Sequence, residues 1–336
     1  MTELLKTLCS IDATSSREKY VADFIRNFSE GKDIKTDALG NVIVNVKGRK
    51  TPKNKVMICA HMDEVGIMAT FIMSDGLIKF ETVGGIQTAV LAGRTVKFEN
   101  GTVGVIGMKP VHLCSPEEKK ALPDYESLYV DIGTDSKEET LKFVCPGDTA
   151  VFTSDFVEMG DKILSKAIDD RAGCAIMLDM IKKGVEYDTV FVFNTQEEVG
   201  LRGSGVSAFS VKPDYAIVLE GTTAADIIDS PEEKKVCVLG KGAAVSFMDR
   251  ATVYSPELFK AAFKVAGENG IAIQAKTMVA GGNDAGSIHK TGAGIRTITV
   301  NVPTRYIHSA SCVCDKNDFM SARLLAEKLS EYFANV

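Results

Sequence analysis

Metal-binding side chains follow four apolar segments of this chain. Each segment reads as a buried strand, and each leads into a histidine or a carboxylate. These are residues 56–60 before His61 and Asp63, 190–193 before Glu197 and Glu198, 216–219 before Glu220, and 295–300, then a Pro303 turn, before His308. Asp169 and Asp170 form a fifth position, just before a predicted helix. The carboxyl ends of strands in open α/β sheets converge on one crevice, so we expect one shared site.

Each of these residues taken alone has a simpler explanation. Asp is a favoured helix N-cap, which would account for Asp169 and Asp170, while Glu197 and Glu198 fit a solvent-facing acidic turn. The combination is harder to explain, because the chain has only 4 histidines and two of them follow the pattern. Two imidazoles with several carboxylates suit zinc, cobalt or manganese better than calcium or magnesium. The set is large enough for two divalent ions if one carboxylate bridges them.

The other two histidines carry weaker signals. His112 and His289 have no comparable partners in the sequence, and we expect both to be structural. His289 follows the glycine-rich stretch 281–286, which reads either as a strand-to-helix turn or as part of a pocket wall.

The composition excludes several classes of partner. With 336 residues, 45% hydrophobic and 25% charged, the chain can form a large core and a second domain. A net charge of -6 with interleaved signs offers no basic surface, so neither nucleic acid nor a membrane is an expected partner. We find no transmembrane run and no secretory pattern. The eight cysteines form no CxxC pair, which indicates reduced thiols and a cytoplasmic protein.

The pattern along the chain divides it into an α/β part and an inserted β part. Glycine-punctuated short strands between 67 and 155 predict a small β-barrel-like domain. Elsewhere, helices and strands alternate, which predicts a mainly parallel or mixed sheet flanked by helices, formed by 1–66 and 156–336. The main predicted helices are 15–28, 171–183, 256–269 and 318–333, and the main strands are 41–46, 56–60, 189–193, 215–219 and 295–300.

Five short motifs, in order and spanning nearly the whole chain, resemble those of the tetrahedral-type dinuclear-metal aminopeptidases. This family includes glutamyl aminopeptidases and members once labelled cellulases. The motifs are AHMDEVG at 60–66, KAIDDRAG at 166–173, QEEVG at 196–200, LEGT at 219–222 and YIHS at 306–309. Any one of them is short, but five in the family's order are specific.

The resemblance implies a role for each residue of the site. One ion would be held by His61, Asp169 and Glu220, and the other by Asp169, Glu198 and His308. Asp169 is chosen over Asp170 as the bridge from its place in the family motif. Asp63 would orient the His61 ring, and Glu197 would be the general base and acid. The fifth ligand is Glu in this chain and Asp in some relatives. The longer side chain leaves the geometry of its ion and the metal preference open.

The expected activity is removal of the N-terminal residue from short peptides. Two ions, zinc or cobalt and less favourably manganese, would activate a water, and Glu197 would transfer its proton. The resemblance also implies that the inserted domain mediates dimerisation and that dimers assemble into a dodecamer. The sequence does not indicate which N-terminal residue is preferred.

Three other functions remain open at this point. A deacylase or carboxypeptidase could use the same dinuclear chemistry. An endoglucanase-type glycosidase would use paired carboxylates, but the chain has no tryptophan and only 7% aromatic residues for stacking on sugars. A metal-stabilised scaffold without activity would leave Glu197 without a purpose.

Overall fold

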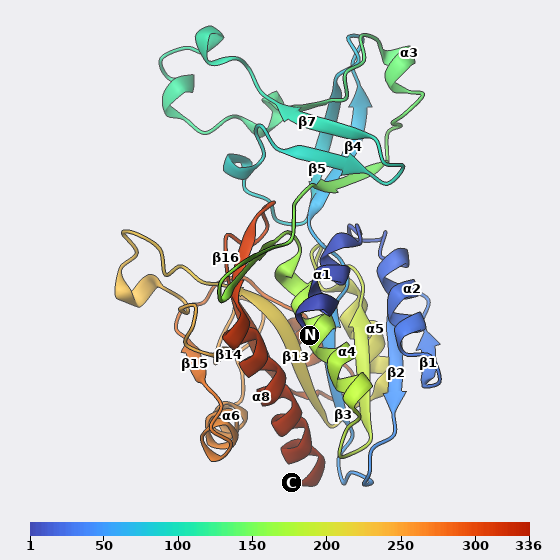
Figure 1. Ribbon diagram of the computed structural model, residues 1–336, viewed down its shortest axis with the longest axis vertical. Helices are drawn as coiled ribbons and strands as arrows, with labels where there is room; N and C mark the ends of the chain where they lie inside the picture. Colours follow the sequence, from blue (N-terminus) through green and yellow to red (C-terminus); the bar gives the residue numbers. More distant parts are fainter.

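An 11-stranded sheet forms the body of the protein, and a closed barrel stands at one end of it (Figure 1). The computed structural model describes residues 1–336. In spatial order the sheet contains β1 (Asp33–Thr36), β2 (Val42–Val46), β12 (Thr189–Asn194), β3 (Val56–His61), β13 (Tyr215–Thr223), β16 (Arg296–Arg305), β17 (Cys312–Asp315), β11 (Lys162–Ser165) and β10 (Val157–Met159). Next to β16 lie β14 (Ala243–Ser246) and β15 (Ile273–Lys276). Strands β12, β3, β13 and β16 run parallel, and the outer strands make the sheet mixed.

Helices cover both faces of the sheet, which confirms the predicted α/β class. One face carries α1 (Thr2–Ser10), α2 (Lys19–Phe28), α4 (Ile168–Lys183), α6 (Pro256–Glu268) and α8 (Lys316–Asn335), and the other carries α5 (Arg202–Val211) and α7 (Ala285–Ile288). Within β3, Val56 and Ile58 enter the larger core, whereas Met57 and Cys59 enter the smaller one. Successive strand side chains point to opposite faces, so an uninterrupted apolar strand serves both cores. None of the helices is long and apolar enough to cross a lipid bilayer.

The barrel contains six strands and a core of 16 buried residues. Around the barrel the order is β4 (Gly66–Ile72), β5 (Ile78–Val83), β8 (Tyr129–Asp131), β7 (Val103–Gly107), β6 (Thr95–Phe98) and β9 (Thr149–Phe152), and the short helix α3 (Lys137–Thr140) lies beside it. All neighbouring strands are antiparallel. Closure of the sheet removes the exposed edges that an open sheet would present.

Two predicted elements differ from the structure. The helix predicted from residue 15 begins only at Lys19, because Ser16 has a φ of 71° and Glu18 accepts a hydrogen bond from the Ser16 amide instead. The turn predicted at Pro303 does not form, and β16 continues to Arg305. Along that edge of β16, β14 pairs up to residue 301 and β17 pairs from residue 304, so Pro303 lies in the gap, where its missing N–H is not needed.

A buried ion cluster supports the loops beneath the carboxyl edge of the sheet. Lys166 Nζ lies 2.7 Å from both carboxylate oxygens of Glu64, and Arg171 Nη2 lies 3.3 Å from Glu64 Oε1. The Arg171 side chain is fully buried and also donates to the backbone carbonyls of Leu8, Ile11 and Met62. It therefore ties the segment after α1 to the segment after β3.

We expect Arg171→Met to lower the free energy of unfolding by about 3–5 kcal/mol, because three buried carbonyls lose their donor and Glu64 loses a charge partner. Urea unfolding of the metal-free protein measures the change. Arg26→Met, which removes a half-exposed pair with Asp23, is the control and should cost no more than about 1 kcal/mol. Equal losses in the two variants would contradict a structural role for the buried cluster.

Candidate active site

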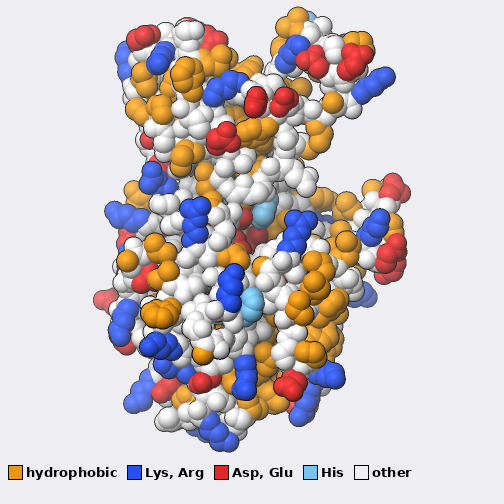
Figure 2. Space-filling model, turned by 180° about the vertical axis from the view of Figure 1, so that it is seen from behind, with side chains coloured by type: hydrophobic (Ala, Val, Ile, Leu, Met, Phe, Trp, Pro, Cys, Tyr) orange, Lys and Arg blue, Asp and Glu red, His pale blue; other side chains and the backbone are white.

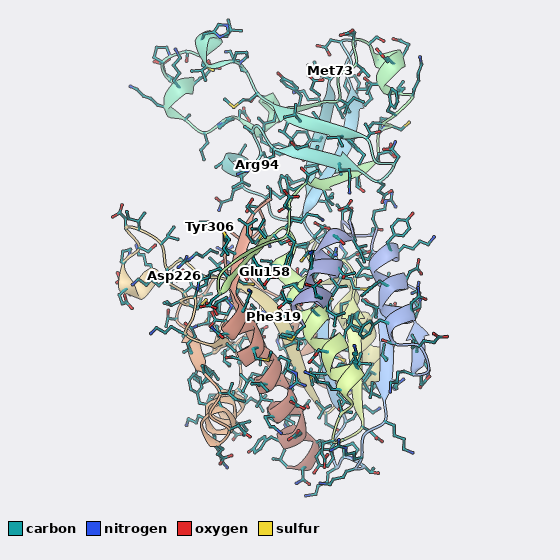
Figure 3. All side chains as sticks on the ribbon, in the orientation of Figure 1. Met73, Arg94, Glu158, Asp226, Tyr306 and Phe319 are labelled. Atoms are coloured by element: carbon teal, nitrogen blue, oxygen red, sulfur yellow. The ribbon has the colours of Figure 1, made fainter.

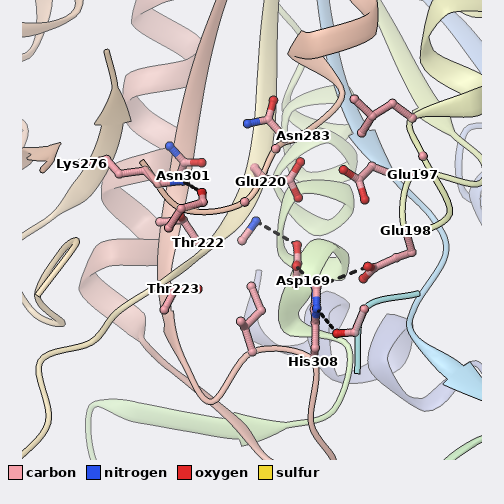
Figure 4. A pocket seen from close by; sticks show the side chains of 18 residues that line it. Asp169, Glu197, Glu198, Glu220, Thr222, Thr223, Lys276, Asn283, Asn301 and His308 are labelled. Carbon is pink, nitrogen blue, oxygen red and sulfur yellow. Dashed lines mark hydrogen bonds and ion pairs between the residues drawn. The ribbon is translucent and has the colours of Figure 1, made fainter. Parts of the chain in front are cut away.

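The carboxyl ends of the central parallel strands bring together the residues singled out in the sequence. His61 is the last residue of β3, and Glu220 lies in the adjacent strand β13. Glu197 and Glu198 follow β12, and His308 follows β16. In Figure 4 the labelled side chains of this group converge on one space. Parallel strands end at the same edge of a sheet, which is why residues so distant in sequence meet here.

The Asp169 carboxylate lies between the two imidazoles. Its Oδ1 is 3.4 Å from Nε2 of His61, and its Oδ2 is 3.4 Å from Nε2 of His308. Glu220 Oε1 lies 3.3 Å from the His61 nitrogen, and Glu198 Oε2 lies 3.3 Å from the His308 nitrogen. Two ligand atoms about 2.1 Å from one tetrahedral ion are about 3.4 Å apart. The four spacings therefore fit two ions that share Asp169.

The neighbouring aspartate has a different environment. Ligand atoms of His61, Asp170 and Glu220 also lie within 4.8 Å of one another. However, Asp170 is fully buried, and its two oxygens accept hydrogen bonds from the backbone amides of His61 and Gly173, at 3.3 and 2.9 Å. Asp169 instead lines the cavity. The geometry thus favours Asp169 as the carboxylate available to ions.

Asp169 itself is held by the strand beside it. The Gly221 amide donates to Asp169 Oδ1 at 3.1 Å. A β-carbon at Gly221 would lie 2.8 Å from the Asp169 side chain, so only glycine allows this close approach. Asp169 and Asp170 also have non-helical backbone angles, so the regular part of α4 begins after them, as the sequence predicted.

Asp63 orients both the His61 ring and the acidic turn. Its carboxylate accepts hydrogen bonds from the backbone amides of Glu197 and Glu198, at 3.1 and 3.2 Å, and from Ser15 Oγ at 2.6 Å. The His61 Nδ1 atom lies 3.0 Å from the backbone carbonyl of Asp63 and 3.4 Å from its carboxylate. The sequence pointed to the contact with the ring but gave no sign of the contact with the turn.

Negative charge is concentrated in this buried space. Burial raises the pKa of Glu220 well above its usual range, and the charge of Asp169 adds to the shift. Burial likewise raises the pKa of Glu197 well above normal; His61 opposes this shift and the charge of Glu198 adds to it. The pKa of Glu198 rises to about 7, again through burial, with His308 opposing. A cation would relieve all three of these carboxyl groups.

The pKa values of both imidazoles are raised as well, which favours their charged form, whereas the raised pKa values of the carboxyl groups favour the neutral form. Although burial opposes it, the contact with Asp169 and the charge of Glu198 raise the pKa of His308 to about 9. Burial disfavours ionisation of Asp169, but His308 and His61 outweigh it and lower its pKa. The buried side-chain atoms without a hydrogen-bond partner include His61 Nε2 and Glu220 Oε2. Buried polar atoms are rarely left so, and the donor set fits divalent ions.

The cavity at the site has a volume of about 320 Å³. Its wall includes Lys276 and Asn301, which the sequence analysis did not identify. The Lys276 side chain is 4% exposed; its Nζ donates to the Ala280 carbonyl at 2.8 Å and makes no ion pair with a carboxylate. Asn301, a polar residue inside an apolar strand, was a signal that could have been used. Lys276 carried none, because only the packing of β15 brings it here.

The structure also shows where the glycine-rich stretch, the other two histidines and the cysteines lie. The stretch 281–283 lines the cavity, so the glycine-rich loop is part of the pocket wall. His289 follows α7, and its Nδ1 lies 2.6 Å from the Ala285 carbonyl. His112 is exposed in a short turn of the barrel. All eight cysteines are free thiols.

Comparison with known proteins gives consistent matches over nearly the whole chain. Residues 40–325 match the model of the M42 glutamyl aminopeptidase family. The chain is 30% identical to a lysyl aminopeptidase of Pyrococcus furiosus, over 98% of this chain and 96% of the relative.

Solved structures agree with the sequence matches. An aminopeptidase from the archaeon Desulfurococcus kamchatkensis superposes with a TM-score of 0.92 at 33% identity, covering 98% of this chain and 94% of that one. The TET1 peptidase of Pyrococcus horikoshii, which can assemble into a tetrahedron or a large octahedral shell, has a TM-score of 0.84 at 33% identity, covering 97% and 98%.

We expect the affinity for zinc or cobalt to rise with pH. Ions bind deprotonated ligands, so a bound ion must displace the proton of His308 below pH about 9 and that of Glu198 below about 7. The dissociation constant should fall about tenfold per pH unit for each proton displaced. Calorimetric titration at pH about 6, 7 and 8, in buffers of different ionisation enthalpy, measures affinity and proton release together. An affinity independent of pH would contradict this protonation scheme.

Proposed function

The chain belongs to the M42 glutamyl aminopeptidase family, and on this basis we propose that it removes N-terminal residues from short peptides at a centre of two divalent ions. It is a metal-dependent aminopeptidase. The observation that carries the proposed centre is the position of Asp169, with one oxygen 3.4 Å from each of the imidazoles of His61 and His308. Family membership favours this activity over the deacylase, carboxypeptidase and endoglucanase alternatives.

Five side chains are proposed to hold the ions. His61 and Glu220 would hold one ion and Glu198 and His308 the other, with Asp169 shared. The spacings of 3.3–3.4 Å and the partnerless atoms of His61 and Glu220 support this division. The nitrogen and oxygen donors favour zinc or cobalt, with manganese as a further candidate.

The protein's own residues would then guide the reaction. Bound divalent ions lower the pKa of a water and polarise the scissile carbonyl. Glu197, one residue from a proposed ligand and 4.0 Å from His61 Nε2, would take the proton of the attacking water and return it to the leaving amine. Asp63 would keep Glu197 in place through the backbone of the acidic turn.

We further propose that the enzyme prefers an acidic first residue. Lys276 lines the same cavity as the proposed metal ligands, and its ammonium group has no carboxylate partner. Burial lowers the pKa of Lys276, although Asp249 opposes this shift, and a substrate carboxylate would favour the charged form. The same cation would repel a lysine side chain, so we expect a specificity opposite to that named for the Pyrococcus furiosus relative.

Domain roles, assembly and location complete the proposal. We assign 1–66 and 156–336 to the catalytic domain, and 67–155 to an inserted domain that mediates dimerisation on the way to a dodecamer. The shells formed by the Pyrococcus horikoshii peptidase support a homo-oligomer, as do the exposed apolar residues Val111, Leu113 and Leu122 of the barrel. Eight free thiols support a reducing, cytoplasmic location.

We expect Glu197→Gln to retain both ions and to lose about 10²–10⁴ in kcat, since the amide cannot accept the proton. Elemental analysis of the purified variant gives the metal content, and turnover of a chromogenic aminoacyl amide gives the rate. Glu233→Gln, the same change in an exposed short 3-10 helix (Glu232–Lys234), should behave as the wild type. Wild-type turnover by Glu197→Gln would remove this residue from the mechanism.

A second variant tests the preference for the first residue. Lys276→Met should reduce kcat/KM for a glutamyl amide, relative to an alanyl amide, by about thirtyfold. This is the loss expected when the buried carboxylate of the substrate no longer has a cationic partner. Lys260→Met, on the exposed side of α6, is the matched control and should leave the ratio unchanged. An unchanged ratio in Lys276→Met, or a wild-type preference for lysyl amides, would reject an acidic preference.

A further inference from the structure

A second, larger hollow adjoins the cavity at the active site. It has a volume of about 950 Å³ and lies between the barrel and the body. It shares Gly85, Thr223, Ala280, Gly281, Ile307 and His308 with the active-site cavity, which places the two spaces side by side. In Figure 2 acidic side chains and a histidine are visible at the bottom of a hollow below the barrel. We call the larger space the exit groove.

The two spaces differ in the residues that line them. The far wall of the active-site cavity is formed by buried residues, among them Thr222, Lys276 and Asn301, which are 3%, 4% and 0% exposed. The exit groove is lined by exposed side chains such as Tyr306, at 56%. An aminopeptidase encloses one residue and must let the remaining peptide leave. The active-site cavity, whose wall carries the ligand carboxylates, therefore suits the first residue, and the adjoining exit groove suits the rest of the peptide.

The charged residues that line the exit groove are two arginines and a histidine. No aspartate or glutamate lines it, whereas Arg94 from the barrel and Arg250 from the body do. Figure 3 shows Arg94 at the lower edge of the barrel and Tyr306 on the body below it. Both arginines are exposed, and neither makes an ion pair. Arg94 Nε contacts only the Val90 carbonyl, at 3.3 Å, which leaves its terminal nitrogens free.

We infer that Arg94 and Arg250 bind a carboxylate of the departing peptide, and so favour short peptides whose C-terminus reaches the groove. This inference rests on the proposed aminopeptidase function. Guanidinium groups present paired donors that match a carboxylate. The carboxylate is the C-terminus of a short peptide or an acidic side chain beyond the scissile bond. In either case binding energy from a part of the substrate far from the reacting bond would lower KM.

Three peptides with the same first residue test the inference in the metal-loaded wild type. They are Glu-Ala-Ala, the same peptide with a C-terminal amide, and the amidated Glu-Ala-Asp. We expect kcat/KM for the free acid to exceed that for the plain amide by about three- to thirtyfold, as for one or two partly exposed ion pairs, with the difference in KM. Salt should reduce the ratio. A high rate for the Asp peptide would identify a side-chain carboxylate as a second source.

Variants locate the effect. Arg94→Gln and Arg250→Gln should each lower the acid-to-amide ratio, and the double variant should bring it close to one. Arg49→Gln removes an equal charge at an exposed position outside the groove, 82% exposed in its side chain, and should keep the wild-type ratio and rate. A wild-type ratio of one, or an unchanged ratio in the double variant, would overturn the inference while leaving the aminopeptidase intact. Failure to cleave these peptides and also alanyl and lysyl amides would instead reject the proposed function.

Discussion

The burial of negative charge around two imidazoles is the constraint on which the rest of this structure depends. Six carboxyl groups, those of Asp63, Asp169, Asp170, Glu197, Glu198 and Glu220, lie in one largely buried region. Two of them, Asp63 and Asp170, are satisfied by backbone amides. The other four face the cavity with oxygens that no protein donor fully satisfies. Such an arrangement is costly unless cations complete it, so the fold itself calls for metal ions.

The surrounding structure is arranged to hold these groups close together. The parallel strands set the register: His61 lies opposite Asn194 of β12, and Glu220 lies opposite Asn301 of β16. Glycine at 221 lets Asp169 approach the sheet, and the buried cluster of Lys166 and Glu64 fixes the loops on either side. Rigid support of this kind keeps catalytic groups in place more precisely than flexible loops would.

Much of this could be read from the sequence. Long apolar strands and amphipathic helices gave the α/β class, and glycine-punctuated short strands gave the barrel, because both patterns follow from local periodicity. Local patterns failed where neighbours decided the outcome. Pro303 continues a strand because the adjacent strands leave a gap beside it, and the short strands β14, β15 and β17 have too little periodicity to be recognised.

By itself the sequence determined which side chains could bind ions, because residue type fixes ligand chemistry and the strand pattern places them at one edge. It could not separate Asp169 from Asp170 without the family motif. Only the tertiary structure shows Asp170 engaged by backbone amides and Asp169 facing two histidines. The packing of the folded chain likewise brings Lys276 to the active-site cavity and Arg94 and Arg250 to the exit groove, and no sequence pattern indicated this. The reason is that each cavity is lined by residues far apart in sequence, which come together only when the chain folds.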